Sequence, residues 1–426
     1  MRFGVARDLI TPAVRMHMGG YGTLQKEWFT GIHDDLFVKT LVLDDGNQRV
    51  VLITYDLLMH DFALTETIAD YIQTQHGIDA EDLLVSYTHN HAGPALEVYD
   101  PGQSSPEYEA FLLDRTKSCI DRALLNVVDG EMEFGWVEGE WSINRRARVD
   151  GEMRNAPNLE GNKDRRLSIL KLSDAEGACK VLLLNFACHP VTLGATLWLS
   201  AEYPGRICQL LEADFYGCVP MFFQGAGGNS RPLIAARPDH RWKDCTFGDL
   251  DGMAQSMASA VRGAVAAGRL RAVEPHLGAV QFVVEPETEV KPKSYFEDLA
   301  AREVDSPSSS GNRLRVILDR YDSTDNTVPL HAAVVRLADD LYMAMLCGEV
   351  CVEVKQEVEK AFEGVDLIFV GYGDGIAYIP DDSLIDEGGY EVDGSVVEFC
   401  LKGRFKKGIN QKLREGYSAA LETLPK

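Results

Sequence analysis

The chain has 426 residues, of which 45% are hydrophobic and 25% are charged, so it can bury a sizeable core, and extensive disorder is excluded. Its 66 acidic residues outnumber 42 basic ones, and the net charge of -24 would repel phosphate backbones and anionic membranes. We therefore expect a small-molecule substrate as the partner, with no nucleic acid and no membrane insertion. The oligomeric state stays open.

The cysteines indicate the redox state of the thiols, and the first residues indicate the cellular compartment of the protein. The start of the chain has no apolar core of signal-peptide length, and no run of about 18 apolar residues occurs anywhere. The 9 cysteines include no CxxC pair and fit reduced thiols better than a disulfide framework or a cysteine zinc site. These features predict a cytoplasmic protein.

Hydrophobic periodicity predicts strands that alternate with helices along the whole chain. The order of these segments predicts an α/β fold, with a mixed β-sheet core flanked by helices. Helices are expected at 62–75, 108–127, 203–215, 248–267, 352–362 and 403–424, and the main strands at 83–87, 167–172, 180–187, 219–223, 277–285, 332–337, 341–346 and 365–371.

We expect a single catalytic domain over residues 1–426 with two loop excursions. The stretch 144–166 is polar and lacks periodicity, and long loops of this kind are often functional. The stretch 286–330 combines proline-rich and serine-rich segments around a short helix, which suggests an excursion or a lid.

Three apolar strands end in residues that could bind a metal ion. THNH supplies His89 and His91, FACHP supplies His189, and CGE supplies Glu349. Side chains at i and i+2 of an extended segment point to the same side, so the first two rings can face one cavity. Sites in open α/β sheets assemble outside strand ends, so all four residues could converge there.

A set of two histidines and a carboxylate suits zinc. Three protein ligands leave a position for a water molecule, whose pKa the ion brings near 7. The spacing is not that of HExxH, so the alternative of separate core or loop histidines with satisfied hydrogen bonds stays open.

The glycine-rich segment QGAGGNSRP is predicted to bind the substrate. The backbone N–H groups of Gly225, Gly227 and Gly228 could cradle an oxyanion, with Asn229 beside them. Ser230 could be a nucleophile only if a base lies next to it. Lysine and the GxGxxG pattern are absent, so nucleotide binding is not expected. A plain strand-to-helix turn is the alternative.

Arg145 and Arg146 supply guanidinium groups that could neutralise a carboxylate or a developing oxyanion. A salt-bridged surface loop is the alternative. The segment 372–391 is rich in glycine, tyrosine and acidic residues, and it suggests an ordered loop after a strand.

Taken together, these segments resemble the N-terminal catalytic domain of neutral/alkaline non-lysosomal ceramidases. The family's THTHSGPG, NRS, QGNAGDVSPN, PGE and GYV or GYIPT segments correspond here to THNHAGPA, NRR, QGAGGNSRP, CGE and AYIPD. A strand that ends in a histidine corresponds to FACHP. The matching segments are spread across the chain in the same order.

The resemblance implies a zinc amidase and assigns its residues by position. It places the metal ligands at His89, His189, Glu349 and Tyr378. His91 and Arg145 then match residues that contact the reacting amide, and they are the expected catalytic residues.

The chain also departs from the family pattern. Pairing the prolines of GDVSP and GNSRP puts Arg231 at the place of the family's serine, with Ser230 one residue earlier and Asn229 at the place of the aspartate. A C-terminal Ig-like domain and a secretory signal are not expected either. These departures favour a small or polar substrate over ceramide itself.

The leading hypothesis is a zinc-dependent hydrolase in which a metal-bound water attacks a C–N amide bond. His91 would serve as general acid/base or hold the substrate, and Arg145 with the backbone amides of 225–228 would stabilise the oxyanion. Arg146 would help to bind the substrate. The open alternatives are a metal-dependent esterase, acyl transfer through Ser230, and an inactive homologue that binds a ligand in the same pocket.

Overall fold

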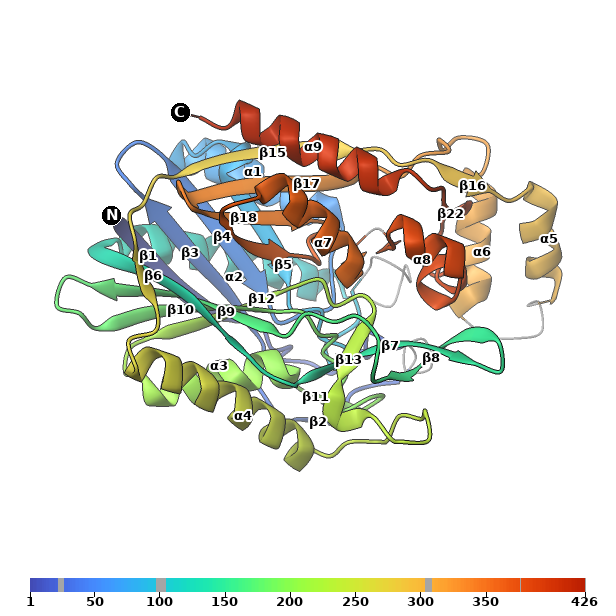
Figure 1. Ribbon diagram of the computed structural model, residues 1–426, viewed down its shortest axis with the longest axis horizontal. Helices are drawn as coiled ribbons and strands as arrows, with labels where there is room; N and C mark the ends of the chain where they lie inside the picture. The colour runs from blue at the N-terminus through green and yellow to red at the C-terminus, as the bar shows by residue number, and fades with distance from the viewer. Residues whose placement is uncertain (22–26, 97–104, 303–308, 376, 426) are drawn as a thin grey trace.

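The computed structural model describes residues 1–21, 27–96, 105–302, 309–375 and 377–425, and it confirms the predicted mixed α/β fold (Figure 1). Two β-sheets face each other across a shared hydrophobic core, and helices cover their outer faces. Within the described part of the chain, none of the helices combines the length and the apolar character needed to cross a membrane.

The larger sheet is assembled from the first two thirds of the chain. Its strands are β1 (Arg2–Leu9), β3 (Phe37–Asp44), β4 (Arg49–Tyr55), β5 (Leu83–Tyr87), β6 (Val128–Glu138), β9 (Arg166–Asp174), β10 (Cys179–Phe186), β12 (Val219–Gln224) and β14 (Arg271–Val273). They lie in the order β12-β10-β9-β6-β1-β3-β4-β5, with β14 paired to β6.

The smaller sheet comes from the C-terminal part and has the order β15-β17-β18-β20. Its strands are β15 (Gly278–Val284), β17 (Leu330–Ala338), β18 (Leu341–Leu346) and β20 (Asp366–Val370). Short ladders join β2 (Gly31–Ile32) to β11 (Trp198–Leu199), β16 (Thr288–Val290) to β22 (Gly403–Phe405), and β19 (Glu349–Val350) to β21 (Tyr378–Ile379).

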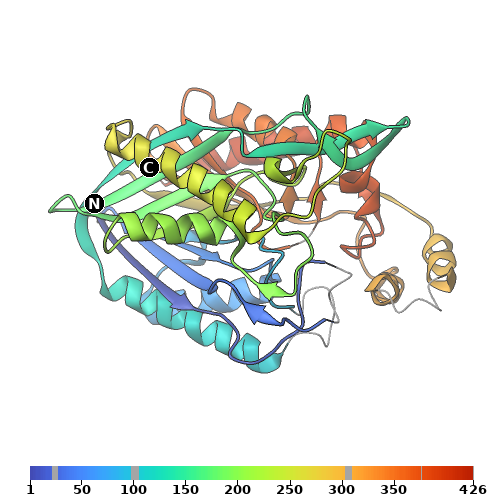
Figure 2. The same ribbon diagram turned by 90° about the horizontal axis from the view of Figure 1, so that it is seen from below.

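Helices cover both sheets from outside. In Figure 2, α3 and α4 lie over one part of the larger sheet and α2 over another, and in Figure 1, α7 and α9 lie over the smaller sheet. The helices are α1 (Phe62–His76), α2 (Pro106–Leu125), α3 (Glu202–Asp214), α4 (Phe247–Ala266), α5 (Lys293–Arg302), α6 (Ser309–Arg320), α7 (Val352–Glu359), α8 (Asp382–Glu387) and α9 (Ile409–Thr423).

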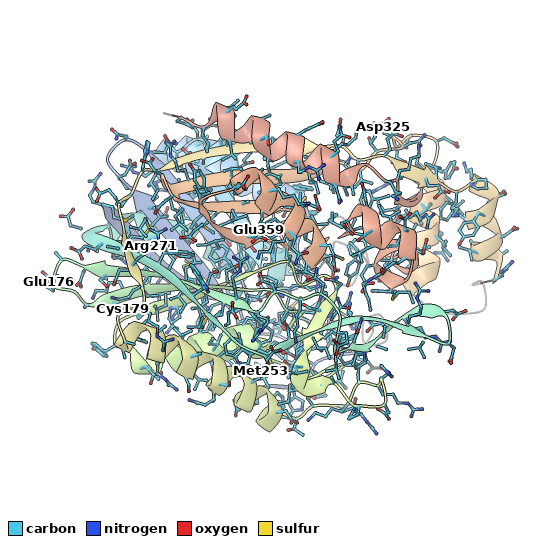
Figure 3. The ribbon with its side chains drawn as sticks, in the orientation of Figure 1. Glu176, Cys179, Met253, Arg271, Asp325 and Glu359 are labelled. Carbon is cyan, nitrogen blue, oxygen red and sulfur yellow. The ribbon has the colours of Figure 1, made fainter. Side chains whose placement is uncertain are left out.

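The larger sheet is buried on both faces, and β3 shows how the sequence produces this. Leu41 and Leu43 point into the core between the sheets, whereas Val38 and Val42 pack under α1 and α2. Side chains alternate along a strand, so a nearly continuous apolar run fills both faces. Side chains fill the space between the layers, and Met253 of α4 packs toward the sheet (Figure 3).

Three parallel strand pairs bring their carboxyl ends to one place. β4 runs parallel to β5, β10 to β12, and β18 to β20. The two sheets are tied together there: the Gly371 N–H donates to the Gln224 carbonyl at 2.9 Å, and Asn185 Nδ2 donates to the Phe369 carbonyl at 2.8 Å. The segments that follow these strands therefore meet, as the strand-end prediction requires.

The stretch 144–166 is not a loop as predicted, because most of it forms a β-ribbon. β7 (Ser142–Val149) pairs with β8 (Glu152–Asn158) on one side and with β13 (Ser230–Pro232) on the other. Strand β7 is not apparent from the sequence because it is polar. Its buried arginines are compensated by acidic residues more than 200 residues away in the chain. Local hydrophobic alternation cannot reveal partners of that kind.

The other differences lie near the C-terminus. The stretch 286–330 contains β16 and two helices, α5 and α6, where a single helix is expected, and its residues 303–308 lie outside the described residues. The segment predicted as one helix over 403–424 begins instead with β22, and α9 starts at Ile409. A short helix, α8, and a π-turn at Tyr390–Gly394 occupy part of the expected ordered loop.

Candidate active site

Three imidazole nitrogens and a carboxylate oxygen meet where the strands end. His89 Nε2 lies 3.1 Å from His189 Nε2 and 3.3 Å from Glu349 Oε2, and the last two atoms are 3.1 Å apart. His91 Nε2 lies 3.0 Å from His89 Nε2. His89 and His91 are neighbours in the sequence, whereas His189 and Glu349 are far from them and from each other. The predicted convergence of His89, His91, His189 and Glu349 is thus present in the structure.

The hydrogen bonds of the other ring nitrogens fix the tautomers. His89 Nδ1 lies 3.1 Å from the Leu58 carbonyl, and His91 Nδ1 lies 2.9 Å from the Gly20 carbonyl. His189 Nδ1 lies 3.1 Å from the Gly227 carbonyl. A carbonyl oxygen only accepts, so Nδ1 carries the hydrogen in each neutral ring and Nε2 is left as a lone pair.

The convergent atoms are therefore all acceptors with no hydrogen between them. Glu349 Oε2 is buried and has no hydrogen-bond partner, although two imidazole nitrogens lie within 3.3 Å of it. Lone pairs at such separations repel each other unless a cation lies between them. A tetrahedral ion with bonds of about 2.0–2.1 Å holds its ligand atoms about 3.3 Å apart. The donor set and its spacing fit a metal ion, and His89, His91 and His189 form a group that could hold one.

Burial and neighbouring charges favour the neutral forms of His91 and His189. Burial lowers the pKa of His189 to about 4, and the nearby Arg145 charge acts in the same direction. Burial also holds the pKa of His91 well below its ordinary value, with a contribution from His89. An anionic carboxylate beside neutral rings is the state that binds a metal cation.

The backbone is strained at two residues of this cluster. His89 has a φ of 62° and Tyr372 a φ of 54°, and for residues with a Cβ this conformation costs about 1–3 kcal/mol each. Tyr372 is fully buried, its ring centroid lies 4.4 Å from that of His89, and its hydroxyl lies 3.2 Å from His189 Nδ1. The strain is maintained because the strand ends hold both rings in place. Sequence reasoning missed Tyr372, and its only local signal is its place between two glycines after an apolar strand.

A glycine-rich turn packs against His91. Gly20 has a φ of 88°, and a Cβ at this position would lie 2.8 Å from the His91 Cα. Only glycine can bring its carbonyl this close to the His91 ring. The next residue, Tyr21, places its ring centroid 5.1 Å from that of His91. The sequence shows the MGGYG turn but gives no sign that it belongs to the site.

Tyr378 lies beside Glu349, because the two residues are partners in the parallel ladder of β19 and β21. The Tyr378 ring is parallel to that of His189, with centroids 6.3 Å apart. Burial raises the pKa of Tyr378 well above its ordinary value, and the Arg145 charge opposes this rise. The phenol ring therefore lies near the candidate metal ligands, and its own role as a ligand stays a prediction.

Arg145 and Arg146 share one buried carboxylate. Arg145 Nε donates to Glu391 Oε1 at 2.8 Å, and Arg146 Nη1 donates to Glu391 Oε2 at 2.7 Å. Arg146 also contacts Glu387 at 3.1 Å and the Gly388 carbonyl at 2.8 Å. Three of these contacts tie Arg146 to the C-terminal part of the chain, and its predicted role in substrate binding stays a prediction. Each arginine keeps one buried nitrogen without a hydrogen-bond partner, Nη2 in Arg145 and Nε in Arg146. Arg145 differs in position, because its guanidinium lies 5.2 Å from the centre of the Tyr378 ring.

The glycine-rich segment does not offer the predicted oxyanion donors. The N–H groups of Gly225, Gly227 and Gly228 donate to the carbonyls of Phe186, Gly225 and Val350 at 2.9, 2.8 and 2.7 Å. These donors are already satisfied, so an oxyanion would have to displace backbone hydrogen bonds. The segment instead supplies the Gly227 carbonyl that orients His189.

Asn229 and Ser230 also make internal hydrogen bonds. Asn229 donates to Glu353 Oε2 at 2.7 Å and accepts from the Val352 N–H at 3.0 Å, so it links β13 to α7 and is corrected from substrate binding to structure. Ser230 Oγ donates to the Ala187 carbonyl at 3.1 Å. None of the hydrogen bonds described for the Ser230 hydroxyl involves a histidine or a carboxylate that could act as its base.

Comparison with known proteins places this geometry in context. The family model described as neutral/alkaline non-lysosomal ceramidase, N-terminal, matches residues 2–217. A solved neutral ceramidase from Pseudomonas aeruginosa has 18% sequence identity and a TM-score of 0.75, covering 100% of this chain and 75% of that chain. A ceramidase complexed with C2 has 18% identity and a TM-score of 0.75, covering 100% and 76%.

At this identity the structural likeness demonstrates a shared fold alone. The range matched by the family model contains His89, His91, Arg145 and His189. Glu349 lies beyond it and is brought to the site by the C-terminal sheet.

Proposed function

Because the chain belongs to the neutral/alkaline non-lysosomal ceramidase family, we propose that it is a zinc-dependent hydrolase of amide bonds. The observation that carries this proposal is the set of buried acceptors about the Glu349 carboxylate, with no hydrogen between them. Two imidazoles and a carboxylate are a donor set that zinc accepts in hydrolases. His89, His189 and Glu349 would hold the ion, with Tyr378 beside them as a further ligand.

His91 is the residue proposed to handle protons. Its Nε2 lies 3.0 Å from His89 Nε2, and the ligand atoms of His89, His91 and His189 all lie within 4.8 Å of one another, so His91 lies beside the proposed ligands. Bound zinc lowers the pKa of water and polarises a carbonyl group. The free Nε2 lone pair of His91 can take a proton and return it to the leaving nitrogen, while the Gly20 carbonyl holds the ring in orientation.

Arg145 is the residue proposed to stabilise negative charge on the substrate oxygen. Its Nη2 is buried and unpartnered, and its Nε is fixed by Glu391, so the free donor is held in a defined direction. Donors that need no reorganisation contribute most to catalysis of acyl transfer. This role replaces that of the glycine N–H groups.

Attack by Ser230 is the less favoured route. Its hydroxyl donates to the Ala187 carbonyl and would have to turn away from it to reach a substrate. A serine becomes a nucleophile only when a base accepts its proton. Attack by water needs no such rearrangement.

The metal proposal is tested by elemental analysis of the purified protein. We expect about one zinc per chain in the wild type and a loss of that zinc in a variant that combines His89→Ala and His189→Ala. His76→Ala is the control, because His76 lies at the end of α1 and forms a hydrogen bond with Asp121. This variant should retain the metal. Full zinc in the double variant would rule out these ligands.

The variant His91→Ala tests whether His91 is a metal ligand or the residue that transfers protons. We expect it to keep the zinc but to lose turnover of amides by about 100-fold or more, which is a typical contribution of general acid/base catalysis. Loss of the metal in this variant would make His91 a ligand instead.

A further inference from the structure

Arg231 is a guanidinium that has no acidic partner in the described part of the chain. Its charged group lies 4.3 Å from the centre of the Trp242 ring, and its Nε is buried without a hydrogen bond. The nearby carboxylate of Glu202 is engaged elsewhere, because it accepts the N–H groups of Leu193 at 2.7 Å and Tyr203 at 3.2 Å. Arg231 is only partly buried, and a guanidinium with a buried unpartnered Nε and no ion pair is able to bind an anion.

Arg231 lies next to the candidate active site. It pairs with Ile143 across the ladder of β13 and β7, and the Arg145 N–H donates to the Asn229 carbonyl at 2.9 Å. The carbonyl of the preceding residue, Ser230, accepts the N–H of His189 at 3.2 Å. Arg231 therefore directly follows a residue that hydrogen-bonds to His189, one of the candidate metal ligands.

Tyr21 connects the two arginines to His91. Its ring contacts that of His91, with centroids 5.1 Å apart. Burial raises the pKa of Tyr21 to about 12, and the charges of Arg231 and Arg145 both oppose the rise. Both guanidinium groups are thus close enough to act on this hydroxyl at the edge of the cluster.

The local charges favour a substrate group with one negative charge. Arg145 and Arg146 face Glu391, and Arg146 also faces Glu387, so these four charges balance. Arg231 adds one positive charge, and no ion pair to it occurs among the described residues. A carboxylate matches a guanidinium fork in charge and in planar geometry. A phosphate dianion would leave one charge without a partner.

We propose that the substrate is an amide that carries a carboxylate, and that Arg231 binds this carboxylate while Arg145 keeps its role at the carbonyl oxygen. The inference rests on the proposed amidase function and specifies its substrate class. N-acylated amino acids are the simplest compounds of this kind. Trp242 holds the Arg231 guanidinium by stacking and leaves its edge free for the anion.

The first experiment measures binding without turnover. 4-Oxopentanoate is a ketone isostere of N-acetylglycine and cannot be hydrolysed, and 4-oxopentanamide is its neutral counterpart. By calorimetry we expect the wild type to bind the carboxylate about 30-fold or more tightly than the amide. The preference should disappear in Arg231→Met and weaken in Arg231→Lys, which keeps the charge but loses the fork.

The control is Arg237→Met, which removes an exposed arginine from the segment after β13 and should keep the full preference. Trp242→Phe reports on the site separately, because tryptophan fluorescence should change on carboxylate binding in the wild type and not in this variant. Equal binding of the two ketones by the wild type would overturn the proposal. Tighter Arg231-dependent binding of inorganic phosphate would overturn the choice of a carboxylate.

The second experiment measures kcat/KM for N-acetylglycine and N-acetylglycinamide. We expect the ratio between the two to fall toward one in Arg231→Met and to stay unchanged in Arg237→Met. Hydrolysis of both compounds at equal rates would refute the substrate class and leave the amidase function intact. Arg231-dependent binding of 4-oxopentanoate without hydrolysis of any amide would refute the amidase function and leave the anion site intact.

Discussion

Replacing Glu391 by glutamine should destabilise the protein strongly. The Glu391 side chain is 2% exposed and accepts from two arginines whose side chains are 5% and 3% exposed. The substitution keeps the shape and removes the charge, so two buried guanidinium groups lose their shared counterion. Burial alone would raise the pKa of Glu391, but Arg145 and Arg146 lower it, which indicates that the carboxylate is charged.

The magnitude follows from the burial of all three groups. Breaking a buried ion pair by removing one partner costs about 3–5 kcal/mol, because the remaining charge stays desolvated. Glu387, which also contacts Arg146, is 43% exposed, and an exposed pair contributes about 1 kcal/mol or less. Glu391→Gln should therefore lower the free energy of unfolding by several times as much as Glu387→Gln.

Urea unfolding followed by fluorescence measures both free energies, and Glu387→Gln is the matched control in the same cluster. Glu391→Gln should also reduce amide turnover, because Arg145 loses the contact that fixes its Nε. Equal losses below about 1 kcal/mol in both variants would contradict the reasoning, since they would mean that water reaches the cluster.

Three further predictions concern other parts of the molecule. His60 is flanked by two carboxylates, and although burial lowers its pKa, those hydrogen bonds raise it to about 9. The resulting stabilisation, about 3 kcal/mol, is complete below pH 6.5 and is lost as the pH rises through 9, so the difference in unfolding free energy from His60→Gln should shrink over that range. Gly20→Ala should reduce kcat/KM, with a smaller effect on the free energy of unfolding, because the added Cβ would displace His91. A normal kcat/KM would contradict this prediction. Ser230→Ala should keep near-normal turnover, whereas loss of a burst of acyl-enzyme in rapid kinetics would favour serine attack.

Sequence patterns correctly predicted the sites at which the chain leaves its strands. An apolar run followed by HxH, CHP or CGE indicates a side chain at a strand end, and the parallel pairs then bring those ends together. The convergence of His89, His189 and Glu349 follows from this local information combined with a general property of α/β sheets. The mixed sheet core was predictable for the same reason.

The sequence by itself thus determined the apolar buried strands, most of the covering helices and the chemical types of the residues at the strand ends, because these depend on local periodicity. Only the tertiary structure decided which polar groups are already satisfied. Arg146 and Glu391 are 245 residues apart, and the N–H groups of the glycine-rich segment find backbone acceptors on other segments. Arg145 and Arg146 are the same residue type, so the position of Arg145 over the Tyr378 ring and the bonds of Arg146 to Glu387 and Gly388 arise from long-range packing.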